Sequence, residues 1–340
     1  MKWFRLLLWA ATLALQPLIV LVPMPGNAAP AFLSVTNPVD IVRYDWFDEQ
    51  RNRPVPVKIY FPRTGAGPFP IIIFSHGLGG SREGYEYLGQ CWAAHGYVSV
   101  HLQHPGSDDS VWQNVPRREV MPNMRKAAAS PSNLTNRPLD ISFVIDRLEK
   151  FNAEASPLKG RLDLARIGVA GHSFGAFTTL AVAGETFVSP TGQKISFGDP
   201  RVKAAIAMSA PVPREIAGDR HQLALAFGQI HIPILHMTGT KDNSPIGETR
   251  ARDRRLPFDY IHGADQFLIT FNGADHMLFS GRSFSLPPAT EALFKEYICE
   301  TSTAFWDACL KNDSQAKTWL MTDFKTELGT GGTFEIKLRE

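Results

Sequence analysis

Short apolar runs without polar alternation recur along this chain and constrain its fold more than any other feature. They lie at residues 71–74, 97–101, 167–170, 204–208, 234–237 and 267–271. Runs of this length and pattern are typical of strands buried on both faces. Helix-length segments separate several of them, at residues 85–95, 139–151 and 174–183. This alternation predicts an α/β fold with a mostly parallel central sheet flanked by helices, whose ligands bind at the carboxyl ends of the strands.

The composition favours one globular domain without a polyanionic partner. Of 340 residues, 44% are hydrophobic and 20% are charged, which is enough apolar material for a sizeable core. The 35 basic and 33 acidic residues are mixed along the chain. No stripe of one sign therefore indicates binding to nucleic acid.

The N-terminus has the layout of an export signal. Lys2 and Arg5 precede an apolar run at residues 6–22, which is followed by Pro and Gly and then by small residues. The alternative is an uncleaved membrane anchor, which requires about 20 apolar residues, whereas this run contains Gln16 and Pro17. We therefore expect a signal peptide at about residues 1–28 and a single domain at residues 29–340. The expected location is secreted or periplasmic, with no stable membrane span after cleavage.

The sequence Gly171-His-Ser-Phe-Gly175 matches the Gly-x-Ser-x-Gly pattern of a nucleophile elbow. The pattern alone is weak, because a chain of this length contains one by chance in roughly one case in ten. Its surroundings strengthen it, since a buried-strand run ends at the motif and a helical run begins directly after it. A serine on such a turn stands at a helix N-terminus, where free backbone N–H groups favour developing negative charge. We therefore expect Ser173 to be a nucleophile.

A serine nucleophile needs a histidine base, whose tautomer is fixed by a carboxylate. On this kind of turn the order along the chain is Ser, then Asp or Glu, then His. Among the histidines after Ser173, His276 alone follows the last predicted strand. Asp242 directly follows the penultimate strand, so we expect it to orient His276. Asp275 is the alternative, but adjacent residues rarely direct their side chains into a mutual hydrogen bond, and an Asx turn is its expected role.

Backbone N–H groups are expected to stabilise the oxyanion of the tetrahedral intermediate. The usual donors are the residue after the nucleophile, here Phe174, and one residue of the turn that follows an early strand. That turn is the His- and Gly-rich sequence at residues 76–80, in which Leu78 is the expected donor. We expect His76 to order the turn rather than to titrate in catalysis.

With these residues in place, the chain resembles the platelet-activating factor acetylhydrolase and predicted dienelactone hydrolase group of α/β-hydrolases, and more loosely the cutinase-type polyesterases. The resemblance extends from about residue 40 to the C-terminal helix. The matching sequences are Phe74-Ser-His-Gly-Leu-Gly79, His104-Pro-Gly-Ser-Asp108, Gly171-His-Ser-Phe-Gly175 and Asp275-His276. The resemblance implies an α/β-hydrolase fold, an acyl-enzyme mechanism without a metal or organic cofactor, and oxyanion donors at Leu78 and Phe174.

Two departures from this group bear on the substrate. Its lipid acetylhydrolases carry their acid after the strand that follows the nucleophile helix, but here that strand leads into Ser209-Ala-Pro211 and supplies no carboxylate. Dienelactone hydrolases use a cysteine nucleophile, whereas this elbow holds a serine. We expect a serine carboxylic ester hydrolase acting on short- to medium-chain acyl esters, small-molecule, lipid or polymer. A polyester hydrolase, a phospholipid acetylhydrolase, an amidase or peptidase, and a catalytically inactive binding domain are the alternatives.

The expected chain length depends on the segment at residues 105–137, which is long for a connection between a strand and a helix. It contains Trp112, Met121 and Met124 and follows the carboxyl end of a strand, so we expect it to roof the site. Such a roof, with Met277 beside the base, would narrow the acyl pocket and disfavour long chains.

Three cysteines permit at most one internal disulfide. Cys299 and Cys309 are close in sequence, but we expect them on one helix, too far apart to bond. Cys91 is expected to be a small buried hydrophobic residue.

Overall fold

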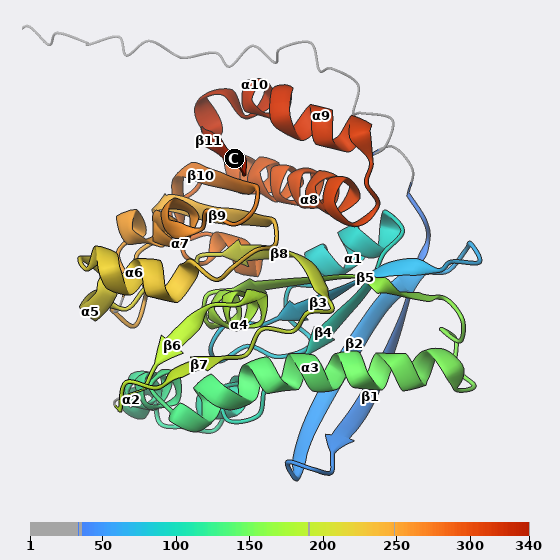
Figure 1. Cartoon of the computed structure of the whole chain (residues 1–340), viewed down its shortest axis with the longest axis horizontal. Coiled ribbons are helices and arrows are strands. Elements are labelled where there is room, and N and C mark those ends of the chain that lie inside the picture. The colour runs from blue at the N-terminus through green and yellow to red at the C-terminus, as the bar shows by residue number, and fades with distance from the viewer. Residues whose placement is uncertain (1–32, 34–35, 190, 248, 340) are drawn as a thin grey trace, which may run out of the picture.

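A nine-stranded sheet forms the centre of the molecule, as Figure 1 shows. The computed structural model describes residues 33, 36–189, 191–247 and 249–339, so the predicted signal peptide lies outside the described residues. From β4 to β10 neighbouring strands pair in parallel, whereas β1, β2 and β11 add antiparallel edges. The strand order is β1 (Val39–Asp48), β2 (Arg53–Pro62), β4 (Val98–Leu102), β3 (Phe69–Ser75), β5 (Leu162–His172), β8 (Val202–Met208), β9 (Ile234–Lys241), β10 (Gln266–Asp275) and β11 (Gly332–Lys337).

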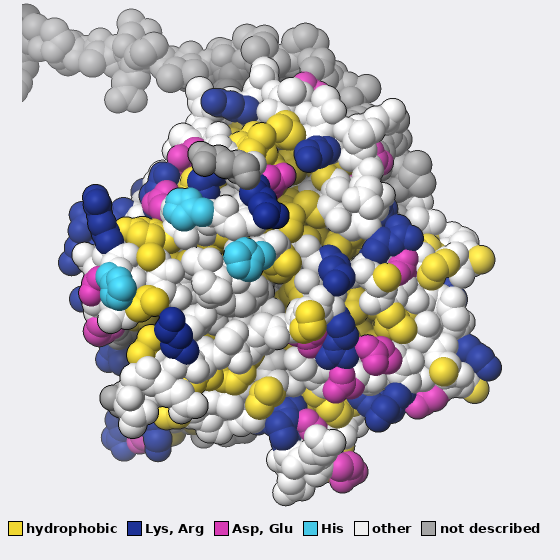
Figure 2. Space-filling model, in the orientation of Figure 1, with side chains coloured by type: hydrophobic (Ala, Val, Ile, Leu, Met, Phe, Trp, Pro, Cys, Tyr) yellow, Lys and Arg dark blue, Asp and Glu magenta, His cyan; other side chains and the backbone are white. Residues whose placement is uncertain are grey.

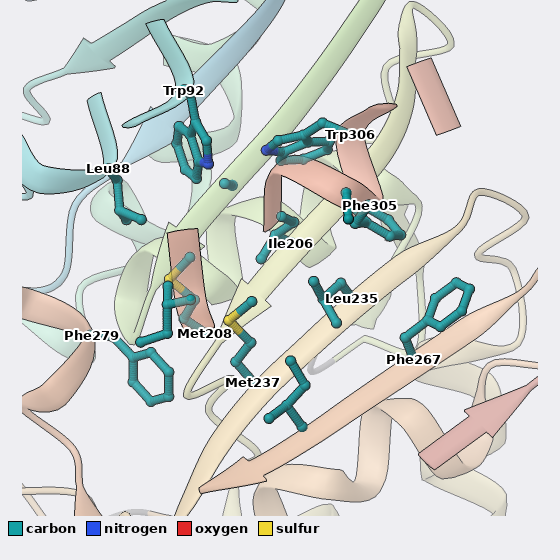
Figure 3. Packing of buried hydrophobic residues seen from close by; sticks show 14 of the residues in the cluster. Leu88, Trp92, Ile206, Met208, Leu235, Met237, Phe267, Phe279, Phe305 and Trp306 are labelled. Carbon is teal, nitrogen blue, oxygen red and sulfur yellow. The ribbon is translucent and has the colours of Figure 1, made fainter. Parts of the chain in front are cut away.

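Each predicted apolar run coincides with one of these strands, except that Tyr97 lies one residue before β4, and this agreement confirms the mostly parallel sheet. Successive side chains of a strand point to opposite faces, and both faces of this sheet are covered. On β3, Ile71 and Ile73 pack with α3 (Pro131–Ala153), whereas Ile72 and Phe74 pack on the other face with α1 (Glu86–Ala94) and α8 (Pro288–Leu310). Figure 3 shows the second core, in which Trp306 of α8 lies near Trp92 of α1. Apolar side chains on both faces are the physical reason for the non-alternating runs.

The helices flank the sheet on both faces (Figure 1). The α4 helix packs directly behind β5 and β8, and α6 packs beside it. The helices are α1 (Glu86–Ala94), α2 (Arg117–Ala128), α3 (Pro131–Ala153), α4 (Phe174–Ala183), α5 (Arg214–Ala217), α6 (Arg220–Phe227), α7 (Leu256–Tyr260), α8 (Pro288–Leu310), α9 (Ser314–Thr322) and α10 (Phe324–Leu328).

Three parts of the fold differ from the sequence-based expectation. The segment at residues 105–137 is not a plain loop, because it contains α2 and the first turns of α3. A hairpin of β6 (Thr186–Val188) and β7 (Lys194–Ser196) extends beyond α4. The helix containing Cys299 is not the last element, since α9, α10 and β11 follow it. Short elements carrying proline or exposed polar residues lack the apolar periodicity that identified the others.

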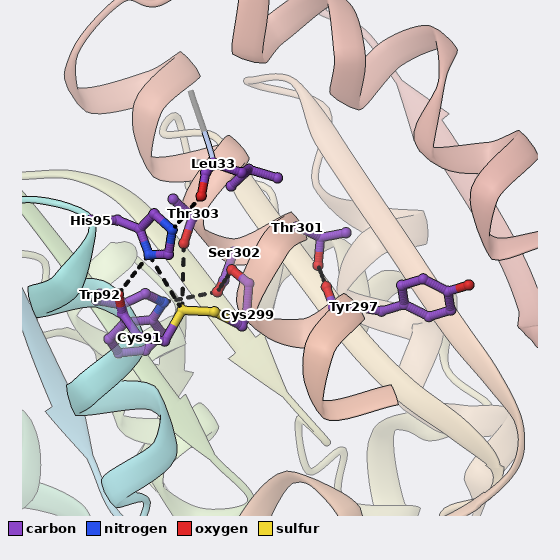
Figure 4. Close-up of a disulfide and its surroundings, with 9 residues drawn as sticks. All are labelled: Leu33, Cys91, Trp92, His95, Tyr297, Cys299, Thr301, Ser302 and Thr303. Carbon is purple, nitrogen blue, oxygen red and sulfur yellow. Dashed lines mark hydrogen bonds between the residues drawn. A yellow bond between two sulfur atoms is a disulfide. The ribbon is translucent and has the colours of Figure 1, made fainter. Parts of the chain in front are cut away.

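The prediction for Cys91 is wrong, because this cysteine forms a disulfide with Cys299 (Figure 4). The bond joins α1 to α8 across 208 residues of sequence, with the two Cα atoms 6.0 Å apart. Cys299 and Cys309 do share the helix α8, as expected, and Cys309 is a free thiol. Sequence proximity could not identify the pair, because tertiary packing of two distant helices brings the sulfur atoms together.

The surface carries charges of both signs. On the face shown in Figure 2, basic and acidic side chains are interspersed with apolar ones. Within the described part of the chain, every helix is too short or too polar to span a bilayer.

Candidate active site

Ser173 occupies the sharp turn between β5 and α4. Its φ of 56° and ψ of −117° lie in a region that side-chain-bearing residues rarely adopt. The flanking glycines make this turn sterically possible. A Cβ on Gly171 would lie 2.3 Å from the carbonyl oxygen of Gly175, and a Cβ on Gly175 would lie 1.8 Å from the carbonyl oxygen of Ser75. The Gly-x-Ser-x-Gly pattern is therefore required by backbone packing in this chain.

The structure brings together the three side chains predicted as nucleophile, base and acid. His276 Nε2 lies 2.9 Å from Ser173 Oγ, and His276 Nδ1 lies 2.7 Å from Asp242 Oδ1. Asp242 follows β9 and His276 follows β10, so neighbouring parallel strands deliver both to one edge of the sheet. Since the Asp242 carboxylate accepts a hydrogen bond from Nδ1–H of His276, the Nε2 atom of His276 is free to accept the hydroxyl proton of Ser173.

Among the described residues, the carboxylate of Asp242 is hydrogen-bonded to the imidazole of His276, whereas the carboxylate of Asp275 is bonded to backbone N–H groups instead. Its Oδ1 accepts a hydrogen bond from the Met277 N–H at 2.9 Å, and its Oδ2 accepts from the Phe284 N–H at 2.6 Å. The Asx turn expected for Asp275 is confirmed. This carboxylate shapes the loop that carries His276.

Asp242 is fully buried, yet it is held as a carboxylate. Burial opposes ionisation, but the Arg254 guanidinium and His276 outweigh it and lower the pKa of Asp242 below its ordinary value. Arg254 Nε lies 2.8 Å from Oδ1, while Ser209 Oγ and Thr238 Oγ1 donate to Oδ2 at 2.6 and 2.8 Å. Both carboxylate oxygens are thus fixed in position.

Sequence reasoning missed Arg254. It lies in the basic stretch Arg250-Ala-Arg-Asp-Arg-Arg255, which looks like a solvated surface. In the structure Arg254 is only 2% exposed, and its Nη1 donates to the carbonyl oxygen of Ser209 at 2.5 Å. No local pattern distinguishes it from the other arginines of the stretch.

Ser209 explains how the acid can lie on a different strand from the one used by lipid acetylhydrolases. It follows β8, where those enzymes carry their acid, and it adopts a positive φ of 55°. Because β8 and β9 are neighbours, side chains at both strand ends reach the same point. Here the carboxylate comes from β9, and Ser209 supplies a hydrogen bond to it.

Leu78 and Phe174, the expected oxyanion donors, line the same cavity as Ser173. Phe174 is the first residue of α4, where a backbone N–H has no partner within the helix, and among the described residues the N–H of Leu78 has no backbone acceptor. His76 orders the turn before Leu78, as predicted. Its Nδ1 donates to the carbonyl oxygen of Gly77 at 2.6 Å, and its Nε2 accepts from the N–H of His104 at 3.1 Å. This turn is therefore held rigid.

Sequence reasoning also missed Arg137, which contacts both the turn before Leu78 and the ring of Phe174. It is fully buried, and its Nη2 donates to the carbonyl oxygen of His76 and to Ser75 Oγ. Its Cζ lies 4.5 Å from the ring centroid of Phe174. Burial lowers the pKa of Arg137 to about 9, so the guanidinium remains charged at neutral pH. This buried cation lies against the turn before Leu78 and against the ring of Phe174, and its charge favours negative charge nearby.

His172, the variable residue of the motif, links the base to the turn at residues 76–80. Its Nε2 donates to the carbonyl oxygen of His276 at 2.9 Å, and its Nδ1 lies 2.8 Å from the Tyr85 hydroxyl. That hydroxyl oxygen accepts the N–H of Gly77 at 3.2 Å. Burial holds the pKa of His172 well below its ordinary value, so the neutral ring connects His276 and Tyr85 through hydrogen bonds.

A second set of Ser, His and Asp side chains lies in the interior of the protein. His104 Nε2 is 2.9 Å from Ser75 Oγ, and its Nδ1 is 2.9 Å from Asp140 Oδ2. All three side chains are fully buried, and the hydroxyl of Ser75 also accepts a hydrogen bond from Arg137. Access therefore distinguishes the two sets, because Ser173 lines the cavity described below, whereas Ser75 is fully buried and does not line it.

The cavity above Ser173 has a volume of about 780 Å³. The size is ordinary for a small-molecule site, and the walls are mostly apolar. Trp112, Met124 and Leu134 come from the segment at residues 105–137, which confirms that this segment covers the cavity. Met277 lies beside the base, as expected. One buried carboxyl group, that of Glu185, also lines the cavity.

In the described part of the chain, one group of potential metal ligands is close enough to share an ion. Atoms of Cys91, His95 and Cys299 lie within 4.8 Å of one another. The two sulfur atoms are joined in the disulfide, however, and are not thiolate ligands (Figure 4).

Comparisons with known proteins point to one family. The family model described as platelet-activating factor acetylhydrolase, isoform II, matches residues 50–123, which include the turn at Leu78 but not Ser173. The platelet-activating factor acetylhydrolase of Bos taurus is 24% identical over 263 residues, covering 68% of this chain and 52% of that protein. That of Canis lupus familiaris is 24% identical over 252 residues (66% and 50%), and that of Cavia porcellus is 25% identical over 154 residues (38% and 35%).

The matches thus span about half or less of the length of these relatives. They agree with the observed sheet and its flanking helices, which form an α/β-hydrolase fold. Together, the fold and the matches show that the chain is similar to the platelet-activating factor acetylhydrolase group of the α/β-hydrolases.

Proposed function

We propose that this protein is a serine carboxylic ester hydrolase that works through an acyl-enzyme intermediate. The observation that carries the proposal is the continuous hydrogen-bonded relay from Ser173 through His276 to Asp242 at the floor of a cavity. Relays of this geometry activate a serine hydroxyl. The names of the related proteins support an ester as the substrate.

In the proposed mechanism, Ser173 Oγ attacks the ester carbonyl carbon while its proton passes to His276 Nε2. The carbonyl oxygen becomes an oxyanion, which accepts hydrogen bonds from the N–H groups of Leu78 and Phe174. His276 then gives its proton to the departing alcohol, leaving the acyl group on Ser173. A water molecule, deprotonated by His276, attacks this acyl group, and the carboxylic acid is released as Ser173 regains its proton. Asp242 stabilises the imidazolium in both halves.

A second candidate is hydrolysis of an acetyl ester in a phospholipid, which the names of the relatives favour. Hydrolysis of a polyester is another candidate, which the position of Asp242 after β9 favours. An amide substrate would use the same relay, and matched ester and amide substrates separate the two. An inactive binding domain is disfavoured because such domains commonly lose one of the three side chains, and this chain retains Ser173, His276 and Asp242.

We further propose that the protein is exported by a signal peptide at about residues 1–28. The Cys91–Cys299 disulfide supports this proposal, because such bonds persist mainly in oxidising compartments.

The test is reaction with a fluorophosphonate probe together with ester turnover. Wild type should be labelled at Ser173, and Ser173→Ala should lose the label. Ester turnover of that variant should fall to a residual on the order of 10³ to 10⁴ over water. Ser244→Ala, which removes another hydroxyl from the cavity wall, should still be labelled. Near-normal turnover by Ser173→Ala would reject the proposal.

A further inference from the structure

Glu185 carries a buried carboxyl group on the wall of the cavity. The residue is 6% exposed, and among the described residues its side chain has no hydrogen bond or ion pair, although its backbone N–H donates to the carbonyl oxygen of Leu180. The cavity's own arginines are engaged elsewhere. Arg254 pairs with Asp242, and the guanidinium of Arg282 lies over the ring of Phe284. A buried, unpaired carboxyl group costs folding free energy, so its presence in a ligand cavity calls for a ligand.

The position of Glu185 separates it from the reacting centre. Ser173 immediately precedes α4, and Glu185 follows the Gly184 that ends this helix. Ten helical residues extend about 15 Å, so the two residues border the cavity at points separated by about the length of α4. Glu185 therefore cannot act on the scissile carbonyl, but it can contact the end of a chain attached to the ester.

The surroundings of Glu185 suit a positive group. Phe177 and Phe187 also line this part of the cavity, with their ring centroids 5.4 Å apart. Aromatic ring faces attract ammonium groups, and a carboxylate forms a charge-assisted hydrogen bond or ion pair with them. Burial raises the pKa of Glu185 to about 8, and a bound cation would favour its ionised form.

We propose that the Glu185 end of the cavity binds an ammonium group carried on the apolar chain of the substrate. This inference rests on the proposed function, since it describes the substrate of the same site. A plain alkyl chain that reaches Glu185 would displace water from the carboxyl group without forming a hydrogen bond or ion pair with it, which costs binding free energy. A chain ending in an ammonium group satisfies the carboxylate and the rings together. The Glu185 end of the cavity thus selects esters of cationic amphiphiles over esters of plain long chains.

The experiment measures binding independently of turnover. Titration calorimetry compares n-alkylammonium ions with n-alkan-1-ols of the same chain length, over a series from short to long chains. For wild type, the ammonium ion should bind on the order of tenfold more tightly than the alcohol once the chain spans the cavity, and equally when it is short. Glu185→Gln should abolish that ratio. Glu215→Gln, which removes the same charge from the exposed surface of α5, should keep it.

The outcomes are decisive for this proposal and separate it from the proposed function. Equal binding of ammonium ions and alcohols by wild type at every length overturns the cation site. Tighter binding of the alcohols also overturns it, in favour of a neutral hydrogen-bonding subsite. An unchanged ratio in Glu185→Gln does the same. A short neutral ester, assayed in parallel, reports on Ser173 alone, so loss of that activity would count against the proposed function and not against this site.

Discussion

The carboxylate of Asp242 depends on side chains from several segments, and this dependence sets what its replacement should do. The hydroxyl groups of Ser209 and Thr238 hold one oxygen, while Arg254 and His276 hold the other. An amide in place of the carboxylate would keep the shape of the residue. It would lose the charge that balances Arg254, and one of its two acceptor oxygens would become an NH2 donor, so the Nδ1 proton of His276 would no longer be fixed.

We therefore predict that Asp242→Asn lowers kcat on an ester by on the order of 10⁴, because the wrong tautomer of His276 becomes favoured. Asp275→Asn should lower kcat by less than about tenfold, since its carboxylate only orders the loop of His276. Steady-state kinetics on both variants decides between them. Urea unfolding serves as a control, because Asp242→Asn also leaves Arg254 without its anion, which costs about 3 to 5 kcal/mol. A folded Asp242→Asn protein with higher activity than Asp275→Asn would show that the acid was wrongly assigned.

At the scale of elements, the disulfide between α1 and α8 ties two helices on one face of the sheet (Figure 4). It closes a loop of 208 residues and so restricts the unfolded chain strongly. Neither cysteine lines the cavity above Ser173. The bond should therefore affect stability and leave the chemistry alone.

We predict that the double variant Cys91→Ser with Cys299→Ser loses about 2 to 4 kcal/mol of unfolding free energy. Its kcat on a short ester should match that of wild type at temperatures where it is folded. Denaturant titration in the presence and absence of a reductant measures the effect, and reductant should weaken wild type but not the double variant. Cys309→Ser is the matched control, because Cys309 is not bonded and burial raises the pKa of its thiol to about 12. Equal stability of the double variant and wild type would contradict the role of the bond.

Elements of this fold differ in how far the sequence identifies them. The parallel strands of the central sheet, β3, β4, β5, β8, β9 and β10, were predictable, because burial on both faces leaves a continuous apolar run. The helix α2 was not, since Pro122 lies inside it, most of its residues are polar or charged, and Ala127 is its single buried residue. The hairpin of β6 and β7 was missed because its strands are three residues long and largely exposed. Such elements owe their structure to neighbouring segments rather than to their own periodicity.

At the scale of the whole molecule, the relay of Ser173, His276 and Asp242 could be predicted from the sequence, whereas the side chains that surround it could not. The relay was predictable because the ends of successive parallel strands must meet, so chain order indicates Ser173, Asp242 and His276. Arg137 and Arg254 were not predictable, since an arginine signals burial only through the tertiary contacts that neutralise it. Glu185 was also missed, because the cavity that it lines is assembled from segments far apart in sequence.

Those distant segments also limit what the cavity can hold, which leads to a prediction about substrate size. Trp112 Nε1 donates to the carbonyl oxygen of Gly79 at 2.7 Å, so the covering segment is fastened to the turn that carries Leu78. At the other end, Glu185 penalises a plain alkyl chain that reaches it. We therefore predict that kcat/KM on p-nitrophenyl esters peaks at short to medium acyl chains. Trp112→Ala should release the cover and move the optimum to longer chains, relative to wild type assayed on the same series. A wild-type profile that peaks at palmitate or longer would mean that the cavity opens into an acyl channel, as in a lipase, and that neither the cover nor Glu185 limits the chain.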